Sequence, residues 1–364
     1  MLGPEDGRLA CEYFGVTEAG NFERGRSVLH GAVDDPAAFA ARQGWTDAQL
    51  AAWLASVRKR LLAARAIRPR PHRDEKIITA WNGLMISAFA RAGRALGKEE
   101  YINAAIHAAE FILSRLRLPD GRLWRSFRER PGPATGFLED YAAFVNGLLD
   151  LYEATFAPRY LELAIEYLGR ILDHFFDREQ GCLWSVETEN LGLADGPRLI
   201  AAASDQSTPS PVGLFLLGAL RLRDAFPNLS SGGEGLGETI EQVLASYSSQ
   251  MDGNAWGCAT LWRVALRLAS GSRQIVLVGA PDEPGFAELR RVVDRAFLPS
   301  STLFWLDPRQ PVPPGLPLWE GKDRINGRPA AYVCQGETCR QPATSAEELR
   351  IQLLPAGGRG GANP

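Results

Sequence analysis

From residue 79 onwards, apolar residues recur at helical spacing in long stretches that are separated by turn-rich connectors. Residues 79–96 are apolar or small on most sides, which predicts a helix that its neighbours cover almost completely. Residues 99–116 differ, because an apolar stripe there runs along a helix whose opposite face is polar. The two stretches together predict an inner helix followed by an outer, partly exposed one.

The same pair of patterns returns further along the chain. Residues 137–156 are apolar-rich like the first inner helix, and residues 158–177 are amphipathic like the first outer one. Residues 209–222 begin a third inner helix, and residues 238–250 form a third outer one. A shorter helix is expected at 256–269.

The connectors repeat as well. "DGRLWRSF" (120–127) resembles "QGCLWSVE" (180–187) at an offset of 60 residues, and each predicts a glycine-centred turn that leads into a short aromatic strand. Such a period indicates an array of helical hairpins. We therefore expect a mainly α protein whose hairpins form an (α/α) toroid, with the loops before the inner helices opening onto a central cavity.

The two ends of the chain have a different character. Residues 37–68 predict a further helix, which is capped near Thr46 and ended by the prolines of "RPRP". Beyond residue 270 the pattern is that of a small α/β subdomain, with strands at 273–281, 301–308 and 330–339 and a helix at 285–297. The expected domains are a toroid portion at 1–270, an α/β subdomain at 271–355 and a disordered tail at 356–364.

Net charge and cysteine content indicate which binding partners and which cellular compartment to expect. The chain has 364 residues and a net charge of -3, which gives no electrostatic reason to expect nucleic acid or an anionic membrane as partner. Its longest apolar runs, such as residues 212–220, are shorter than the ~20 residues that span a bilayer. Five cysteines, mostly scattered singly, favour a reducing compartment, so we expect a cytoplasmic protein.

In a toroid, functional residues are expected where the inner helices begin. The first such place holds Lys76, Trp81 and Asn82, which are candidate substrate-binding residues, with the Trp81 ring stacking on a sugar-like ring. His72 lies in the preceding loop and is the only credible general base among the four histidines. Packing of Trp81 and solvation of the charged side chains are the structural alternatives.

The second place is "GFLEDYA" (136–142), at the start of the second inner helix. Glu139 or Asp140 is a candidate catalytic acid or base, and Tyr141 is a candidate wall or sugar-stacking residue. Carboxylates in a first turn also interact favourably with the helix dipole without any catalytic role, so a structural role stays open.

The third place is "ASDQSTPSPVG" (203–213), before the third inner helix. Asp205 is the candidate catalytic carboxylate there and Ser210 a candidate substrate-binding residue, although hydroxyl residues around Pro209 also form an ordinary N-cap. Asp140 and Asp205 together would supply the paired carboxylates of glycoside chemistry.

Cys334 and Cys339 follow a predicted strand with four residues between them. A structural pair of thiols at a turn and a reversible, redox-active disulfide are both open. No two histidines, and no histidine with a glutamate, stand at zinc-ligand spacing, and no glycine-rich phosphate loop follows a strand. We therefore expect neither a metal nor a cofactor.

Four separated segments resemble one protein family: "YFGVTEAGNFERGRSVLH" (13–30), "DEKIITAWNGLMISAFARAGRAL" (74–96), "GFLEDYAAFVNGLLDLYEATF" (136–156) and "RPAAYVCQGETCRQPATSAEEL" (328–349). They are similar to the thioredoxin-domain-containing proteins related to spermatogenesis-associated protein 20. The resemblance implies a thioredoxin-like domain followed by a toroid similar to N-acylglucosamine 2-epimerases and six-hairpin glycosidases. This chain begins inside the toroid region and lacks the thioredoxin-like domain, so we expect an incomplete ring, a fragment that a missing domain or a second chain would complete.

The residues and the resemblance together imply a carbohydrate-active-enzyme-like toroid. It would act on or bind a sugar-like small molecule in a central cavity through carboxylate acid/base chemistry. The related epimerases depend on cavity histidines, and here only His72 is near an inner-helix start, which disfavours epimerisation. Epimerase- or isomerase-like activity, glycosidase-like activity, a non-catalytic binding or redox-linked module, and an inactive truncated remnant all stay open.

Overall fold

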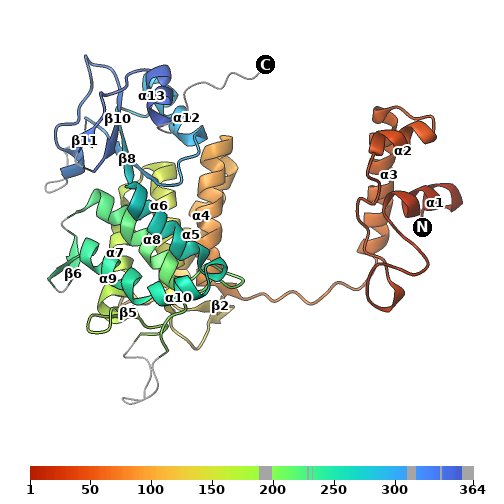
Figure 1. The fold of residues 1–364 in the computed structure, drawn as a ribbon, viewed down its shortest axis with the longest axis horizontal. Coiled ribbons are helices and arrows are strands. Elements are labelled where there is room, and N and C mark those ends of the chain that lie inside the picture. The colour runs from red at the N-terminus through yellow and green to blue at the C-terminus, as the bar shows by residue number, and fades with distance from the viewer. Residues whose placement is uncertain (188–198, 228, 232, 310–316, 337, 355–364) are drawn as a thin grey trace. The chain divides into compact units, whose positions relative to one another are not determined.

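The computed structural model describes all residues except 188–198, 228, 232, 310–316, 337 and 355–364. The predicted tail at 356–364 therefore lies outside the described residues. The chain divides into two compact units, Met1–Asp74 and Glu75–Pro364 (Figure 1). The segment predicted as the toroid portion thus contains a separate small unit ahead of the helical hairpins.

The first unit is helical and has a core of its own. It contains α1 (Pro4–Tyr13), the short 3-10 turn Glu23–Gly25, α2 (Pro36–Arg42) and α3 (Asp47–Ala66). Thr46 caps α3 by accepting a hydrogen bond from the backbone N–H of Gln49, as the sequence predicts. Phe39 is fully buried and packs with Leu9 and Leu50.

The second unit is built from helical hairpins, and this part of the fold confirms the predicted repeat. The hairpins are α4 (Thr79–Leu96) with α5 (Glu99–Phe111), α6 (Leu138–Thr155) with α7 (Pro158–His174), and α8 (Pro211–Ala225) with α9 (Leu236–Ser246). A π-helical turn, Ile112–Leu116, extends α5, and α10 (Ser248–Gly253) leads to α11 (Ala259–Ser270). The inner helices α4, α6, α8 and α11 pack in this order, so the mainly α fold is an arc of hairpins as in an (α/α) toroid (Figure 1).

Helix α6 lies at the centre of this arc, and almost all of its residues are buried. It approaches α4 closely at two glycines. A Cβ added at Gly83 would lie 2.7 Å from the backbone of Ala143, and one added at Gly147 would lie 2.8 Å from the Gly83 carbonyl oxygen. The absence of these two side chains therefore permits the backbones to pack against each other.

The connectors confirm the predicted turns. Gly121 and Gly181 both adopt positive φ angles, of 85° and 65°. The backbone N–H of Leu123 donates to the Tyr141 hydroxyl, and that of Leu183, 60 residues later, donates to the Tyr247 hydroxyl. The Gly181 turn lies between the paired strands β4 (Phe176–Asp177) and β5 (Cys182–Leu183). The Gly121 turn precedes β2 (Ser126–Arg128), which pairs with β1 (Ile77–Ile78) and β3 (Arg130–Pro131). A separate hairpin consists of β6 (Ser230–Ser231) and β7 (Glu234–Gly235).

The chain ends in the predicted α/β subdomain. Its sheet has the order β11-β10-β8-β9, in which β8 (Arg273–Val278) and β9 (Ser301–Leu306) are parallel and β10 (Ala330–Gln335) and β11 (Thr338–Cys339) are antiparallel neighbours. Alternate residues of β8 face opposite sides, so Val276 and Val278 join the core of the hairpins. Ile275 and Leu277 pack with α12 (Pro284–Arg295) and α13 (Ala346–Leu353) instead.

Two further observations concern this part of the fold. Helix α13 was not among the predicted elements, because its apolar positions are few and it lies close to the glycine-rich end of the chain. Among the described residues, none of the helices combines the length and the apolar character that a membrane span requires.

Candidate functional site

Asp140 lies in the first turn of α6 and connects the starts of two inner helices. Its carboxylate accepts hydrogen bonds from Phe137 N and Ala80 N, both at 2.8 Å, so one side chain satisfies donors at the beginning of α6 and of α4. Arg125 contacts it at 3.2 Å and pairs with Glu139 at 2.6 Å. Burial raises the pKa of Asp140 to about 7, although these hydrogen bonds and Arg125 favour the ionised form.

Asp205 lies in the loop before α8 and makes a similar connection between the next two inner helices. Its carboxylate accepts hydrogen bonds from Ser210 N at 2.7 Å and Thr260 N at 2.9 Å, and so connects the starts of α8 and α11. Partial burial opposes ionisation, but these hydrogen bonds hold the pKa of Asp205 below its ordinary value. Ser210 is the N-cap of α8, where its hydroxyl accepts from Gly213 N.

Tyr141 is fully buried, and its surroundings are those of a core residue. Its ring packs against Tyr167 and Phe175. Its hydroxyl accepts from Leu123 N at 2.9 Å and donates to Glu187 at 3.2 Å. Burial, with the nearby Glu187 carboxylate, raises the pKa of this hydroxyl above its ordinary value.

The remaining predicted residues near the first inner helix lie at the surface. Trp81 is 58% exposed on α4, and the amide of Asn82 donates back to the Ile78 carbonyl oxygen at 2.9 Å. Lys76 is exposed just before β1. His72 is exposed and belongs to the first unit. In the described part of the chain, no hydrogen bond or ion pair joins Asp140 to Asp205, so these predicted residues do not form one cluster through direct contacts.

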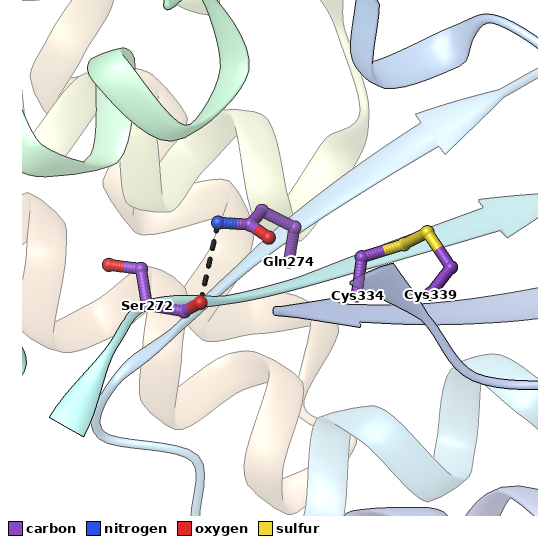
Figure 2. Close-up of a disulfide and its surroundings, with 4 residues drawn as sticks. All are labelled: Ser272, Gln274, Cys334 and Cys339. Atoms are coloured by element: carbon purple, nitrogen blue, oxygen red, sulfur yellow. Dashed lines mark hydrogen bonds between the residues drawn. A yellow bond between two sulfur atoms is a disulfide. The ribbon is translucent and has the colours of Figure 1, made fainter. Parts of the chain in front are cut away.

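Cys334 and Cys339 form a disulfide across the hairpin of β10 and β11 (Figure 2). Cys334 is buried and Cys339 is exposed, so the disulfide joins a buried residue to one at the surface. A redox role for this pair stays a prediction. No three metal-ligating side chains gather anywhere in the described residues.

A cavity of about 360 Å³ lies along the middle and C-terminal halves of the inner helices. Helices α4, α6, α8 and α11 line it on one side, and α12, β9 and the loop between them line it on the other. Its polar lining consists of five arginines, three carboxylates, Ser87, Ser301 and Asn146; the charged residues are Arg91, Arg94, Asp150, Glu153, Arg221, Arg263, Arg267 and Asp294. None of the residues predicted as catalytic or substrate-binding is part of this lining.

Alternating charges form a chain through the cavity wall. Arg221 contacts Asp150 at 2.9 Å and Glu153 at 2.8 Å, and Glu153 in turn contacts Arg94 at 2.6 Å. Arg94 then reaches Asp294 of α12 at 2.9 Å. Burial opposes ionisation of Glu153, yet the two arginines hold its pKa well below its ordinary value. The carboxylate is therefore ionised at neutral pH and serves as a fixed acceptor.

Two more polar side chains complete the wall on α4 and α6. The Ser87 hydroxyl donates to Asp150. The Asn146 amide donates to the carbonyl oxygens of Ala142 at 2.9 Å and Leu214 at 2.8 Å. Each of these groups comes from an inner helix, so the polar lining is held by rigid elements.

A repeated pattern of polar residues in the sequence indicates this cavity, although the predicted site residues lie elsewhere. Asn146, Asp150 and Glu153 of α6 each follow Ser87, Arg91 and Arg94 of α4 by 59 residues. The spacing within each set, three or four residues, places its members on one helix face. Polar residues repeated on one face of two otherwise apolar helices predict that both faces line a shared polar space. Arg221 of α8 continues the pattern.

Comparisons with known proteins place the chain among relatives of one kind. No family model matches it. The chain is 31% identical to human spermatogenesis-associated protein 20 over 96% of its own length, and 30% identical to the rat protein of that name over 95%. It spans 46% of each relative, or about half of their length. An uncharacterised protein of Caenorhabditis elegans is 26% identical over 94% of the chain.

The chain also has remote likenesses among solved structures. A GH76 α-mannanase from Bacteroides thetaiotaomicron is 14% identical with a TM-score of 0.44, covering 62% of this chain and 58% of that one. Cellobiose 2-epimerase from Bacillus thermoamylovorans is 14% identical with a TM-score of 0.40, covering 62% of each chain. At these scores the likenesses carry no argument for an activity. Over nearly all of its length, this chain is a homologue of spermatogenesis-associated protein 20.

Proposed function

We propose that this chain binds a sugar-like small molecule in the cavity between its inner helices and the α/β subdomain. The observation that carries the proposal is the cavity itself, most of whose polar residues come from four neighbouring inner helices. Its volume of about 360 Å³ falls within the range of ~300–1,000 Å³ that small-molecule sites occupy. A hydroxyl-rich ligand needs both donors and acceptors, and this wall supplies both.

The donors and acceptors have distinct sources. Arginine side chains on α4, α8 and α11 supply donors, while Asp150 and the Asn146 carbonyl oxygen supply acceptors. Hydrogen bonds to charged groups are stronger than those between neutral groups. Because these side chains lie on helices rather than on loops, they are already in position before a ligand arrives.

The contacts support binding more than hydrolysis or epimerisation. A glycosidase needs one carboxyl that keeps its proton and a second that does not. Arg221 pairs with both Asp150 and Glu153, and together with Arg94 it holds the pKa of Glu153 below its ordinary value. The Asp140 and Asp205 carboxylates are engaged by backbone N–H groups at the helix starts. Carboxylate acid/base chemistry stays a prediction.

A pair of tryptophan substitutions tests the proposed site. Ala95 and Ala88 are both exposed on α4, but only Ala95 lines the cavity. We expect the wild-type chain to bind at least one member of a panel of neutral and acidic mono- and disaccharides in isothermal titration calorimetry. A95W should weaken that binding at least tenfold by filling the cavity, and A88W should leave it unchanged. Failure of every saccharide to bind the wild-type chain would contradict the proposal.

A further inference from the structure

Two arginines on the cavity wall form no ion pair with a carboxylate among the residues that the structure describes. Arg91 extends from α4 and Arg263 from α11, the first and last helices of the arc, and both line the same cavity. Both are exposed, and neither forms a hydrogen bond or an ion pair in the described part of the chain. Arg263 adds only a weak attraction to Asp205, whose oxygens are engaged by the starts of α8 and α11.

Each of the other arginines in the lining forms an ion pair with a carboxylate. Arg221 lies between Asp150 and Glu153, and Arg94 lies between Glu153 and Asp294. Asp294 is also shared with Arg290 of α12, at 2.6 Å. The three carboxylates of the described cavity lining are therefore already paired with other arginines, and none of them pairs with Arg91 or Arg263.

The remaining arginine of the lining shows that positive charge is concentrated here. Arg267 pairs with Asp224 at 2.7 Å and donates to the Thr302 hydroxyl at 2.6 Å. Burial lowers the pKa of Arg267 despite that pairing, and repulsion from Arg221 acts in the same direction. An anion in the cavity would relieve this repulsion as well as compensate the two unpaired arginines.

We propose that the ligand of this cavity is anionic: a sugar or similar polyol bearing a phosphate or carboxylate group, which Arg91 and Arg263 bind. The inference rests on the proposed function and names its ligand class. The planar guanidinium group matches both phosphate and carboxylate, to which it donates two parallel hydrogen bonds. The paired residues Arg221, Asp150 and Glu153 then face the hydroxyl groups of the same molecule.

The test compares a neutral sugar with two acidic sugars and with inorganic phosphate alone. Isothermal titration calorimetry of the full chain would use glucose, glucose 6-phosphate, glucuronate and inorganic phosphate. We expect at least one of the two acidic sugars to bind at least tenfold more tightly than glucose, and this preference to weaken as salt is added. The stronger of the two identifies phosphate or carboxylate as the recognised group.

Substitutions then assign the effect to the two arginines. The double variant R91Q/R263Q should lose the preference for the acidic sugar, with at least tenfold weaker binding. Both side chains are exposed and unpaired, so the variant is expected to fold, and its melting temperature checks this. Arg115, which is exposed near the end of the first outer helix and outside the cavity, supplies the matched control R115Q.

The possible outcomes separate this inference from the proposed function. Equal binding of glucose and the acidic sugars would overturn the inference and leave sugar binding intact. Binding of inorganic phosphate alone, lost in R91Q/R263Q, would support the anion site and contradict sugar binding. An acidic-sugar preference that R91Q/R263Q retains would overturn the assignment to these arginines. Absence of any binding would overturn both proposals.

Discussion

Asp140 shows at the scale of one residue how a carboxylate near a helix start acquires a structural role. It is fully buried, and its oxygens accept backbone hydrogen bonds from the first turns of α4 and α6. Asp205 makes the same kind of connection between α8 and α11. First-turn N–H groups lack partners within their own helix, so a shared carboxylate stabilises two helices at once.

The burial of Asp140 predicts a pH dependence of stability. Its pKa is raised from 3.8 to about 7, so the folded chain holds this proton more tightly than the unfolded chain does. The stability that the protonated group contributes is therefore present below pH 3.8 and is lost as the pH rises to about 7. We expect the difference in unfolding free energy between the wild type and D140N to fall over this range, by roughly 4 kcal/mol in total.

Urea denaturation at several pH values measures this difference. E139Q is the matched control, because Glu139 is in the same turn and pairs with the same arginine but is partly exposed. A difference for D140N that stays constant with pH would show that Asp140 does not titrate in this range.

At the scale of the element, the contact between α4 and α6 depends on two glycines. Their helices approach so closely that a methyl group at Gly147 would meet the Gly83 carbonyl oxygen and Ile86. Alanine is normally the better helix former, so the presence of glycine here opposes local helix propensity. Packing between the two inner helices outweighs propensity at this position.

Alanine substitutions separate these two effects. We expect G147A to lower the free energy of unfolding by roughly 1–3 kcal/mol, because the added methyl group pushes the helices apart. Gly169 of α7 has open space around it, so G169A should raise the free energy by about 1 kcal/mol through propensity alone. Chemical denaturation of both variants provides the measurement, and a stabilising G147A would argue against the close contact.

Over the whole second unit, the charged chain joins the helical arc to the α/β subdomain. Glu153 contacts Arg94 and Arg221, and it also accepts from Leu303 N of β9 at 3.4 Å. Asp294 of α12 extends this series of ion pairs from Arg94 into the subdomain. A single carboxylate on α6 therefore influences how two parts of the unit pack.

Removing that carboxylate tests the connection. E153Q leaves two buried arginines with fewer partners, and we expect it to lower the free energy of unfolding by roughly 3–5 kcal/mol. E166Q is the control, because Glu166 pairs with Arg117 at the surface, where such pairs contribute at most about 1 kcal/mol. Equal losses for the two variants in thermal or urea unfolding would show that the buried chain contributes no special stability.

The arrangement of helices was largely predictable from the amino-acid pattern. The apolar stripes and the 60-residue offset of the connectors indicated inner and outer helices in alternation, and the described hairpins follow that order. These features are local, because helix periodicity and turn chemistry act over a few residues. Helix α13 is not predicted by these patterns, because its apolar stripe is short and weak.

The position of the cavity depended on contacts between distant residues. Arg94 pairs with Glu153 across 59 positions and with Asp294 across 200. The polar positions on α4 and α6 indicate a shared polar space, but which of their charges pair depends on tertiary contacts. Local sequence patterns therefore favour the helix starts, which carry Asp140 and Asp205, over the polar residues within the helices. Apolar periodicity alone suffices for the hairpin array. Folding in three dimensions decides which charges neutralise one another, and in the described part of the chain it leaves Arg91 and Arg263 without an ion pair.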